Sequence, residues 1–193
     1  MLVKYSQYAK YENVRVTIPR TVVVATDYFD AFIRNNGLEY VLTTEMTDEE
    51  ILSEFVSSTL PYKLREALKA YVRTVSGPLA VRSSSKLEDS HYQPFAGIYS
   101  TYMIPYTEGN EDRQLRLLQK AIKSVYASTY FAASKAYVQS SQNLIAEEKM
   151  AVVIQEVCGT EQDGLFFPTL SGVARSINYY PIGDETPEEG VCN

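Results

Sequence analysis

Short β-rich runs alternate along this chain with amphipathic helical segments, and this alternation is the feature that most restricts the fold. Strands are predicted over 21–25, 79–84, 97–105, 150–155 and 172–179. Between several of these runs, apolar residues recur at the three- and four-residue spacing of a helix with one buried face. Such a mixture predicts an α+β or α/β domain and excludes a helix bundle or a β-sandwich.

Capping signals set the expected ends of the helices. Asp27 is predicted to cap a helix that Gly37 ends. Thr47 and Glu50 have the spacing of a capping box, in which a hydroxyl and a carboxylate satisfy each other's backbone N–H groups. Asn110 is predicted to cap the longest helix.

A further helix is predicted to begin after Pro61, because proline is tolerated in the first turn. Its apolar stripe includes Leu68. We expect this helix to pack on a sheet that contains Val81 and Val153. Leu68 should then be fully buried.

Composition limits the classes of function. The 193 residues are 45% hydrophobic, which suits one domain with a sizeable core, and no run approaches the roughly 18 apolar residues of a membrane helix. A net charge of −6 argues against binding to nucleic acid or to anionic membranes. Two cysteines fit a reducing compartment and a cytoplasmic location. One histidine rules out a multi-histidine metal site within the chain.

The first candidate site runs from Arg82 to Thr101. A strand is predicted to end near Arg82, and Gly97 precedes a strand that begins with hydroxyl residues. A phosphate chain needs a guanidinium fork, close backbone N–H groups and short hydroxyl donors, and these residues could supply all three. The alternative is a surface arginine in an ordinary salt bridge.

The second candidate site is the end of the apolar strand at Gln155, Glu156 and Val157. A purine ring could be read here by backbone groups and by the Gln155 amide, with apolar side chains against the ring. The alternative is a strand end with polar residues. Cys158, which follows, is expected to be a small packed residue rather than a nucleophile.

The third candidate is the loop that contains Glu88, Asp89 and His91. Two carboxylates and an imidazole could bind a metal or move protons. No helical or strand geometry fixes them, so a solvated loop is the favoured interpretation.

Four segments together resemble the nucleotide-binding domain of phosphoenolpyruvate synthase and pyruvate phosphate dikinase, a domain also found in rifampicin phosphotransferases and glucan-water dikinases. The first is the Val-Arg-Ser-Ser run at 81–84, followed by Glu-Asp, then Phe-Ala-Gly, and then Thr101 four residues after Gly97. The others lie at 18–26, 152–155 and 171–174. Arg20 and Thr21 stand where this family usually has proline and glycine.

The resemblance implies an ATP-grasp-like fold, with a mixed or antiparallel sheet flanked by helices and ATP between two lobes. It implies transfer of a phosphoryl group from ATP to a histidine on a swivelling domain, and then from that histidine to pyruvate or a related acceptor. Carried over by motif, Arg82 would contact the phosphates and serve catalysis, and Gly97 and Thr101 would line the phosphate loop. Gln155 would reach adenine beside the backbone of Glu156 and Val157.

Other parts of the family's pattern are missing. A Gly-Gly-Lys segment near the start, the Mg²⁺ ligands, the phosphoacceptor histidine segment and the pyruvate-binding barrel do not occur here. We therefore expect a piece of a longer enzyme, inactive alone, with Mg²⁺ ligands outside the chain. Residues 1–13 are expected to be a linker or helix tail, 14–158 the first lobe, and 159–193 the start of an incomplete second lobe.

Two functions remain open at this point. The first is the ATP-binding part of a dikinase-type phosphotransferase, whose partners would be the phosphoacceptor and pyruvate-binding domains of the full-length protein. The second is a nucleotide-sensing or structural module that kept the fold and lost the chemistry. Thr21 and Arg175, which depart from the family pattern, favour a divergent branch.

Overall fold

The computed structural model describes residues 18–85, 99–140 and 149–192. The described residues form two compact units, one that runs through Val157 and one that begins at Cys158. They are called here the N-terminal unit and the C-terminal unit. No helix in the described ranges is long and apolar enough to cross a membrane.

A four-stranded antiparallel sheet forms the centre of the N-terminal unit. Its strands are β1 (Thr21–Val24), β2 (Leu79–Ser85), β3 (Tyr102–Ile104) and β4 (Met150–Glu156), in the order β1-β4-β2-β3. In the register, Val23 lies opposite Val153, and Val153 lies opposite Arg82. The sheet is therefore antiparallel throughout, one of the two arrangements expected, and β4 joins segments far apart in the sequence.

Local sequence explains the first two helices. Helix α2 (Thr26–Asn36) ends at Gly37, which adopts the left-handed conformation at φ 62°, as predicted. Its N-cap is Ala25 and not Asp27, because Asp27 lies inside the first turn, where its charge suits the helix dipole. Helix α3 (Asp48–Ser57) follows a short 3-10 helix, η2 (Leu38–Leu42), and begins with the predicted capping box.

Three further helices complete the N-terminal unit. Helix α4 (Tyr62–Val72) follows Pro61, and helix α5 (Glu111–Ser128) is capped by Asn110, whose side chain accepts a hydrogen bond from the Arg113 amide at 3.0 Å. Helix α6 (Ala132–Ser140) was not predicted. Its first amide donates to Asp48 Oδ1 at 2.8 Å, so a residue 84 positions earlier in the chain caps it.

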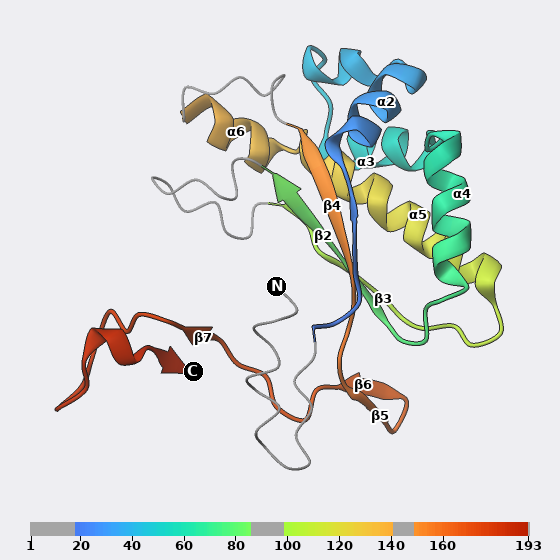
Figure 1. Ribbon diagram of the computed structural model, residues 1–193. Coiled ribbons are helices and arrows are strands. Elements are labelled where there is room, and N and C mark those ends of the chain that lie inside the picture. Colours follow the sequence, from blue (N-terminus) through green and yellow to red (C-terminus); the bar gives the residue numbers. More distant parts are fainter. Residues whose placement is uncertain (1–17, 86–98, 141–148, 193) are drawn as a thin grey trace. The chain divides into compact units, whose positions relative to one another are not determined.

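The helices form two layers over one face of the sheet (Figure 1). Helix α5 packs directly on β2, β3 and β4, and α2 packs on β4. Helices α3 and α4 pack on α5. The main packing partner of α4 is thus α5, whereas we expected the sheet. Leu68 is buried, with 2% of its surface exposed, but it lies in the outer helical layer.

An aromatic cluster fills the core where α2, α3 and α5 meet. Phe29 contacts Tyr126 edge to face, with ring centroids 5.0 Å apart, and Phe32 lies 5.7 Å from Phe55. Phe55 also contacts Tyr130, at 5.3 Å. Burial raises the pKa of the Tyr126 and Tyr130 hydroxyls far above the usual value. The contacts among these rings pack α2, α3 and α5 against one another.

Two small antiparallel strand pairs make up the C-terminal unit. Strands β5 (Thr160–Gln162) and β6 (Leu165–Phe167) are joined by Asp163 and Gly164, both with positive φ, as a two-residue hairpin of the mirror-image type requires. Strand β7 (Ala174–Arg175) pairs with β8 (Val191–Cys192). The strand predicted over 172–179 is thus reduced to two residues, because its partner is equally short.

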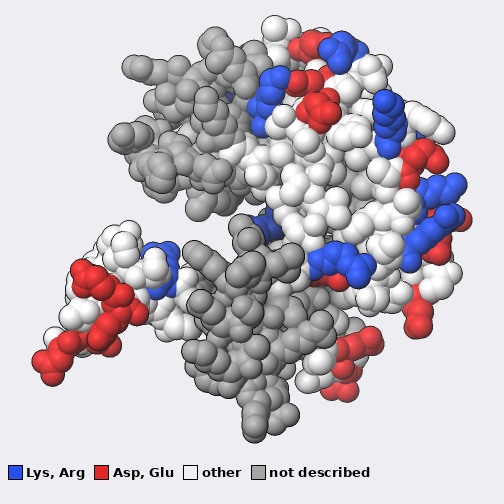
Figure 2. Space-filling view, in the orientation of Figure 1, with Lys and Arg blue, Asp and Glu red and all other residues white. Residues whose placement is uncertain are grey.

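The remainder of the C-terminal unit is exposed. Residues 179–189 include the 3-10 helix η4 (Pro187–Glu189), and none of their side chains is buried. Figure 2 shows acidic side chains gathered over this segment, whereas charges of both signs are interspersed over the helical part of the N-terminal unit. Asn178 is the buried polar residue of this unit, and its side chain donates to Glu185 and accepts from the Tyr180 amide.

Candidate functional site

The face of the sheet that turns away from the helices carries the candidate site, and it is called here the open face. On β4, Met150, Val152 and Ile154 are buried under the helices. The residues that alternate with them therefore point to the open face. The register adds their partners on the neighbouring strands, so the open face consists of Thr21, Val23, Ala80, Arg82, Ser84, Met103, Ala151, Val153 and Gln155.

Arg82 lies in the middle of β2 and not at its end, because the strand continues through Ser85. Its side chain is exposed on the open face, opposite Val153. No ion pair among the described residues involves Arg82. Among the described residues, therefore, no carboxylate neutralises the guanidinium, which leaves it able to contact a phosphate.

Gln155 lies one row away from Arg82 on the same face, because Val153 is opposite Arg82 and Gln155 is two residues further along β4. The Gln155 amide donates from Nε2 to Thr21 Oγ1 at 2.9 Å. Thr21 is directly opposite Gln155 on β1. The structure thus brings two of the predicted site residues, Arg82 and Gln155, to one surface.

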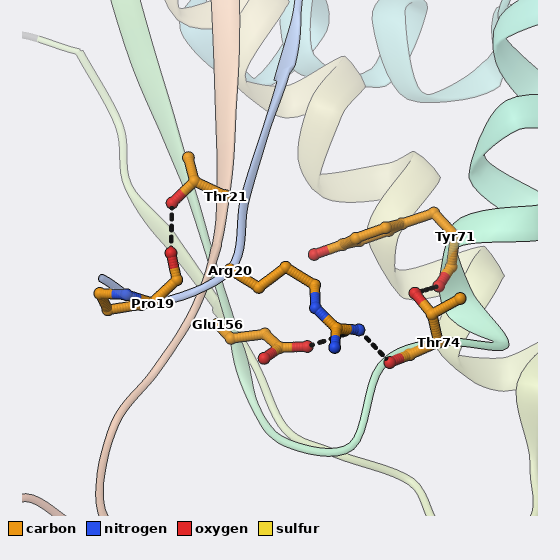
Figure 3. A network of polar contacts seen from close by, with 6 residues as sticks. All are labelled: Pro19, Arg20, Thr21, Tyr71, Thr74 and Glu156. Atoms are coloured by element: carbon orange, nitrogen blue, oxygen red, sulfur yellow. Dashed lines mark hydrogen bonds and ion pairs between the residues drawn. The ribbon is translucent and has the colours of Figure 1, made fainter. Parts of the chain in front are cut away.

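Glu156 follows Gln155 in β4 and points to the opposite side, toward the helices. Its carboxylate lies 3.7 Å from the Arg20 guanidinium, which also donates to the Thr74 carbonyl at 2.5 Å (Figure 3). Burial and the Glu156 carboxylate raise the pKa of the nearby Tyr71, while Arg20 opposes the shift. This polar network was not predicted. The alternation of inward and outward side chains along β4 could have predicted that Glu156 faces the helices. No pattern in the sequence predicts its contacts with α4.

The backbone of the same segment is held by its neighbours. The Glu156 amide donates to the Arg20 carbonyl at 3.0 Å, and the Val157 amide donates to the Pro78 carbonyl at 2.9 Å. Both N–H groups are therefore engaged within the N-terminal unit. At this end of β4, the Gln155 side chain is the polar group that faces outward.

The structure describes only some of the remaining predicted residues. Thr101 is exposed immediately before β3. Gly97 lies outside the described residues. Glu88, Asp89 and His91, which make up the third candidate site, lie outside them as well. The possible pairing of Arg82 with that loop is therefore also outside the described residues. Cys158 is exposed and free, which corrects the expectation that it is packed, because β4 ends at Glu156 before reaching it.

The metal that the resemblance implies has no ligand set here. Within the described ranges, no three side chains of the His, Cys, Asp or Glu type are arranged to hold a metal ion. None of the open-face residues is a carboxylate. These residues do not fit Mg²⁺, and no step is assigned to that ion.

A hollow of about 360 Å³ lies away from the open face, between the end of α4 and the start of α5. Two of its polar side chains have partners at the hollow: Arg73 pairs with Glu111 at 3.3 Å, and the side-chain oxygen of Gln114 accepts from the Thr107 backbone amide at 3.1 Å.

Comparison with known proteins agrees with the predicted resemblance. Residues 4–191 match the family model described as pyruvate phosphate dikinase, AMP/ATP-binding domain. The uncharacterized phosphotransferase YvkC of Bacillus subtilis is 31% identical over 157 residues, which is 78% of this chain and 17% of that protein. Phosphoenolpyruvate synthase of Aeropyrum pernix is 29% identical over 174 residues, 79% of this chain and 20% of that protein.

The chain thus spans no more than 20% of the length of these two curated relatives. The matched residues include all four strands of the sheet and the helices that cover it. The resemblance stated from the motifs is therefore confirmed, and the chain belongs to the pyruvate phosphate dikinase AMP/ATP-binding domain family, the N-terminal domain of phosphoenolpyruvate synthase-like phosphotransferases.

Proposed function

We propose that this chain is the ATP-binding portion of a phosphoenolpyruvate synthase-like phosphotransferase, with ATP on the open face of the sheet. The observation that carries the proposal is the placement of Arg82 and Gln155. They come from motifs more than 70 residues apart, and the sheet presents them on one face, one row apart. The Arg82 guanidinium suits a phosphate, and the Gln155 amide suits a base.

The base end of the site is assigned to β4 and β1. Val153 and Val23 lie opposite each other on the open face, and Val23 exposes 58% of its surface. A purine ring resting on these side chains would remove apolar area from water, while the Gln155 amide at the same end provides a directional hydrogen bond. Because the Glu156 and Val157 amides are already engaged, their part in the contact is limited to their carbonyl groups.

The phosphate end is assigned to Arg82, with Thr101 and Gly97. A guanidinium can contact two phosphate oxygens at once and stabilise charge that develops during transfer. Thr101 offers an exposed hydroxyl. Gly97 keeps its predicted role in the phosphate loop as part of this proposal.

The full reaction is proposed from the family. ATP would phosphorylate a histidine on another domain, and the phosphoryl group would pass to pyruvate or a related acceptor. The chemistry requires charge neutralisation by Mg²⁺, whose ligands are not among the described residues. We therefore propose an ATP-grasp-like nucleotide site that binds ATP but does not transfer phosphate by itself.

Calorimetry with the 193-residue chain tests this proposal. We expect saturable binding of ATP and, with Mg²⁺ present, no phosphate release above that of a protein-free control. Absence of binding at millimolar ATP would overturn the proposed site. Mg²⁺-dependent phosphate release would show that the chain holds its own metal ligands, and Glu88 and Asp89 would then be the first to substitute.

A further inference from the structure

A chain of two hydrogen bonds connects Gln155 to the backbone at the start of β1. Gln155 Nε2 donates to Thr21 Oγ1 at 2.9 Å, and Thr21 Oγ1 donates to the Pro19 carbonyl at 3.0 Å. Figure 3 shows the second of these bonds. All three residues belong to the N-terminal unit, and Thr21 and Gln155 are direct cross-strand partners.

The direction of these two hydrogen bonds is fixed by the last acceptor, the Pro19 carbonyl. A carbonyl oxygen only accepts hydrogen bonds, so the single hydroxyl proton of Thr21 is committed to Pro19. The Thr21 oxygen can then only accept from Gln155. An amide has one donating and one accepting end, and the end that faces Thr21 must be the NH₂ group.

The consequence is that Gln155 Oε1 is turned away from Thr21. Among the described residues, no donor contacts this oxygen. Gln155 is partly exposed on the open face, so Oε1 is available there as a hydrogen-bond acceptor. Without Thr21, rotation of the amide by half a turn would present a donor instead, and the residue would accept either kind of partner.

From this geometry we infer that Thr21 makes the site selective for a purine with an amino group at position 6 over one with a carbonyl there. The inference rests on the proposed function, because it assumes that the base contacts Gln155. A 6-amino group donates to Gln155 Oε1. A 6-carbonyl places a second acceptor against it, and both oxygens then lose their bonds to water without gaining a partner. Thr21 is thus a positioning residue that acts through Gln155.

Binding of ATP and inosine triphosphate to the 193-residue chain tests the inference, because the base of the second nucleotide carries a carbonyl in place of the 6-amino group. The wild-type chain should bind ATP about tenfold to a hundredfold more tightly, the range set by one unsatisfied buried polar group. Thr21→Val keeps the shape of the side chain and removes the hydroxyl. The ratio of the two dissociation constants should fall to within about threefold of unity, while Thr21→Ser should retain it.

Thr43→Val is the matched control. The Thr43 hydroxyl is also exposed and donates to a backbone carbonyl, that of Tyr40 at 3.1 Å, but it lies beyond α2 and off the sheet. This variant should leave the ratio unchanged. Thermal unfolding of each variant, followed by circular dichroism, checks that the fold is retained.

The amide orientation can be measured without any nucleotide. In the free wild-type chain, the side-chain NH₂ protons of Gln155 should show nuclear Overhauser contacts to the Thr21 side chain. Equal affinity for the two nucleotides, an unchanged ratio in Thr21→Val, or absence of these contacts would overturn the inference and leave ATP binding intact. Failure to bind either nucleotide would overturn the proposed function, and the inference with it.

Discussion

At the scale of single residues, the two faces of β4 carry polar side chains with different surroundings. Gln155 faces outward with Thr21, and Glu156 faces the helices with Arg20. The inward pair is structural, because its carboxylate is mostly buried beside Tyr71 and α4. The Gln155 amide and Arg82 lie instead on the open face, where we propose that ATP binds. Adjacent polar residues at a strand end can therefore face different surroundings.

Arg82→Ala should weaken ATP binding by about tenfold to a hundredfold, the loss of one charged hydrogen bond. The free energy of unfolding should change by less than about 0.5 kcal/mol, because the side chain is exposed. Arg82→Lys should recover little, since a point charge cannot contact two oxygens as a planar fork does. Calorimetry and urea denaturation measure the two effects.

Arg73→Ala is the control for this substitution. Arg73 is an exposed arginine that pairs with Glu111 at 3.3 Å on the helical side. Its loss should leave ATP affinity within about twofold of the wild-type value, as expected for a surface ion pair away from the site. If both variants bind ATP like the wild-type chain, Arg82 does not contact the phosphates.

At the scale of elements, the sequence predicted the ends of helices and strands better than the layers in which they pack. The end of α2 at Gly37, the capping box of α3 and the extents of β2 and β4 follow from local chemistry and were predicted closely. Helix α6 was missed because its cap, Asp48, is distant in sequence. Periodicity also identified the buried face of α4, but it cannot say whether the partner is a sheet or another helix.

Leu68→Ala tests the outer helical layer. Leu68 is 2% exposed on α4, which packs on α5, and its truncation should lower the free energy of unfolding by about 2–5 kcal/mol. Lys69→Ala, the exposed neighbour on the same helix, should change it by less than about 0.5 kcal/mol. Urea titrations of both variants give the comparison. Equal small effects would mean that α4 is not packed as described.

The capping box of α3 should make stability depend on pH. The Thr47 backbone amide donates to the Glu50 carboxylate at 2.8 Å, and this bond, with a second from the Thr47 hydroxyl, lowers the pKa of Glu50 below 4.5. A lowered pKa in the folded state stabilises the protein above pH 4.5, and the stabilisation is lost as pH falls through the folded-state value. The advantage of wild type over Glu50→Gln should therefore shrink between about pH 6 and about pH 3.

Glu49→Gln is the matched control, because Glu49 lies in the same first turn but takes no part in the capping box. Its effect on stability should vary less over the same range of pH. Denaturant titrations at several pH values supply both curves. A difference between wild type and Glu50→Gln that does not change with pH would contradict the role given to the carboxylate.

At the scale of the whole molecule, the motifs predicted the family, and the sheet brings two of the proposed site residues together. Arg82 and Gln155 come from separate motifs, and only the pairing of β2 with β4 puts them on one face. The link between Gln155 and Thr21 could not be predicted, because it depends on the register of β1 against β4. The hairpin at Asp163 and Gly164 could have been predicted, since Asp-Gly between two strands is a strong hairpin signal.

The two units differ in how much apolar surface they bury. All the buried apolar side chains of the described chain lie in the N-terminal unit. In the C-terminal unit, Leu170, Tyr180 and Ile182 are 90%, 87% and 81% exposed, and the strands are two or three residues long. So little burial leaves the entropy cost of ordering this unit poorly offset.

Hydrogen exchange on the 193-residue chain should therefore separate the two units. Backbone amides of β4 lie in a paired central strand over the core, and they should exchange only on global unfolding. Amides of β7 and β8 should exchange at least about a hundredfold faster, because local opening there exposes almost no additional apolar surface. Mass spectrometry of peptic peptides from 150–157 and 172–192 measures both. Comparable protection would mean that the apolar side chains of the C-terminal unit are covered in solution, and that its stability does not depend on its own burial alone.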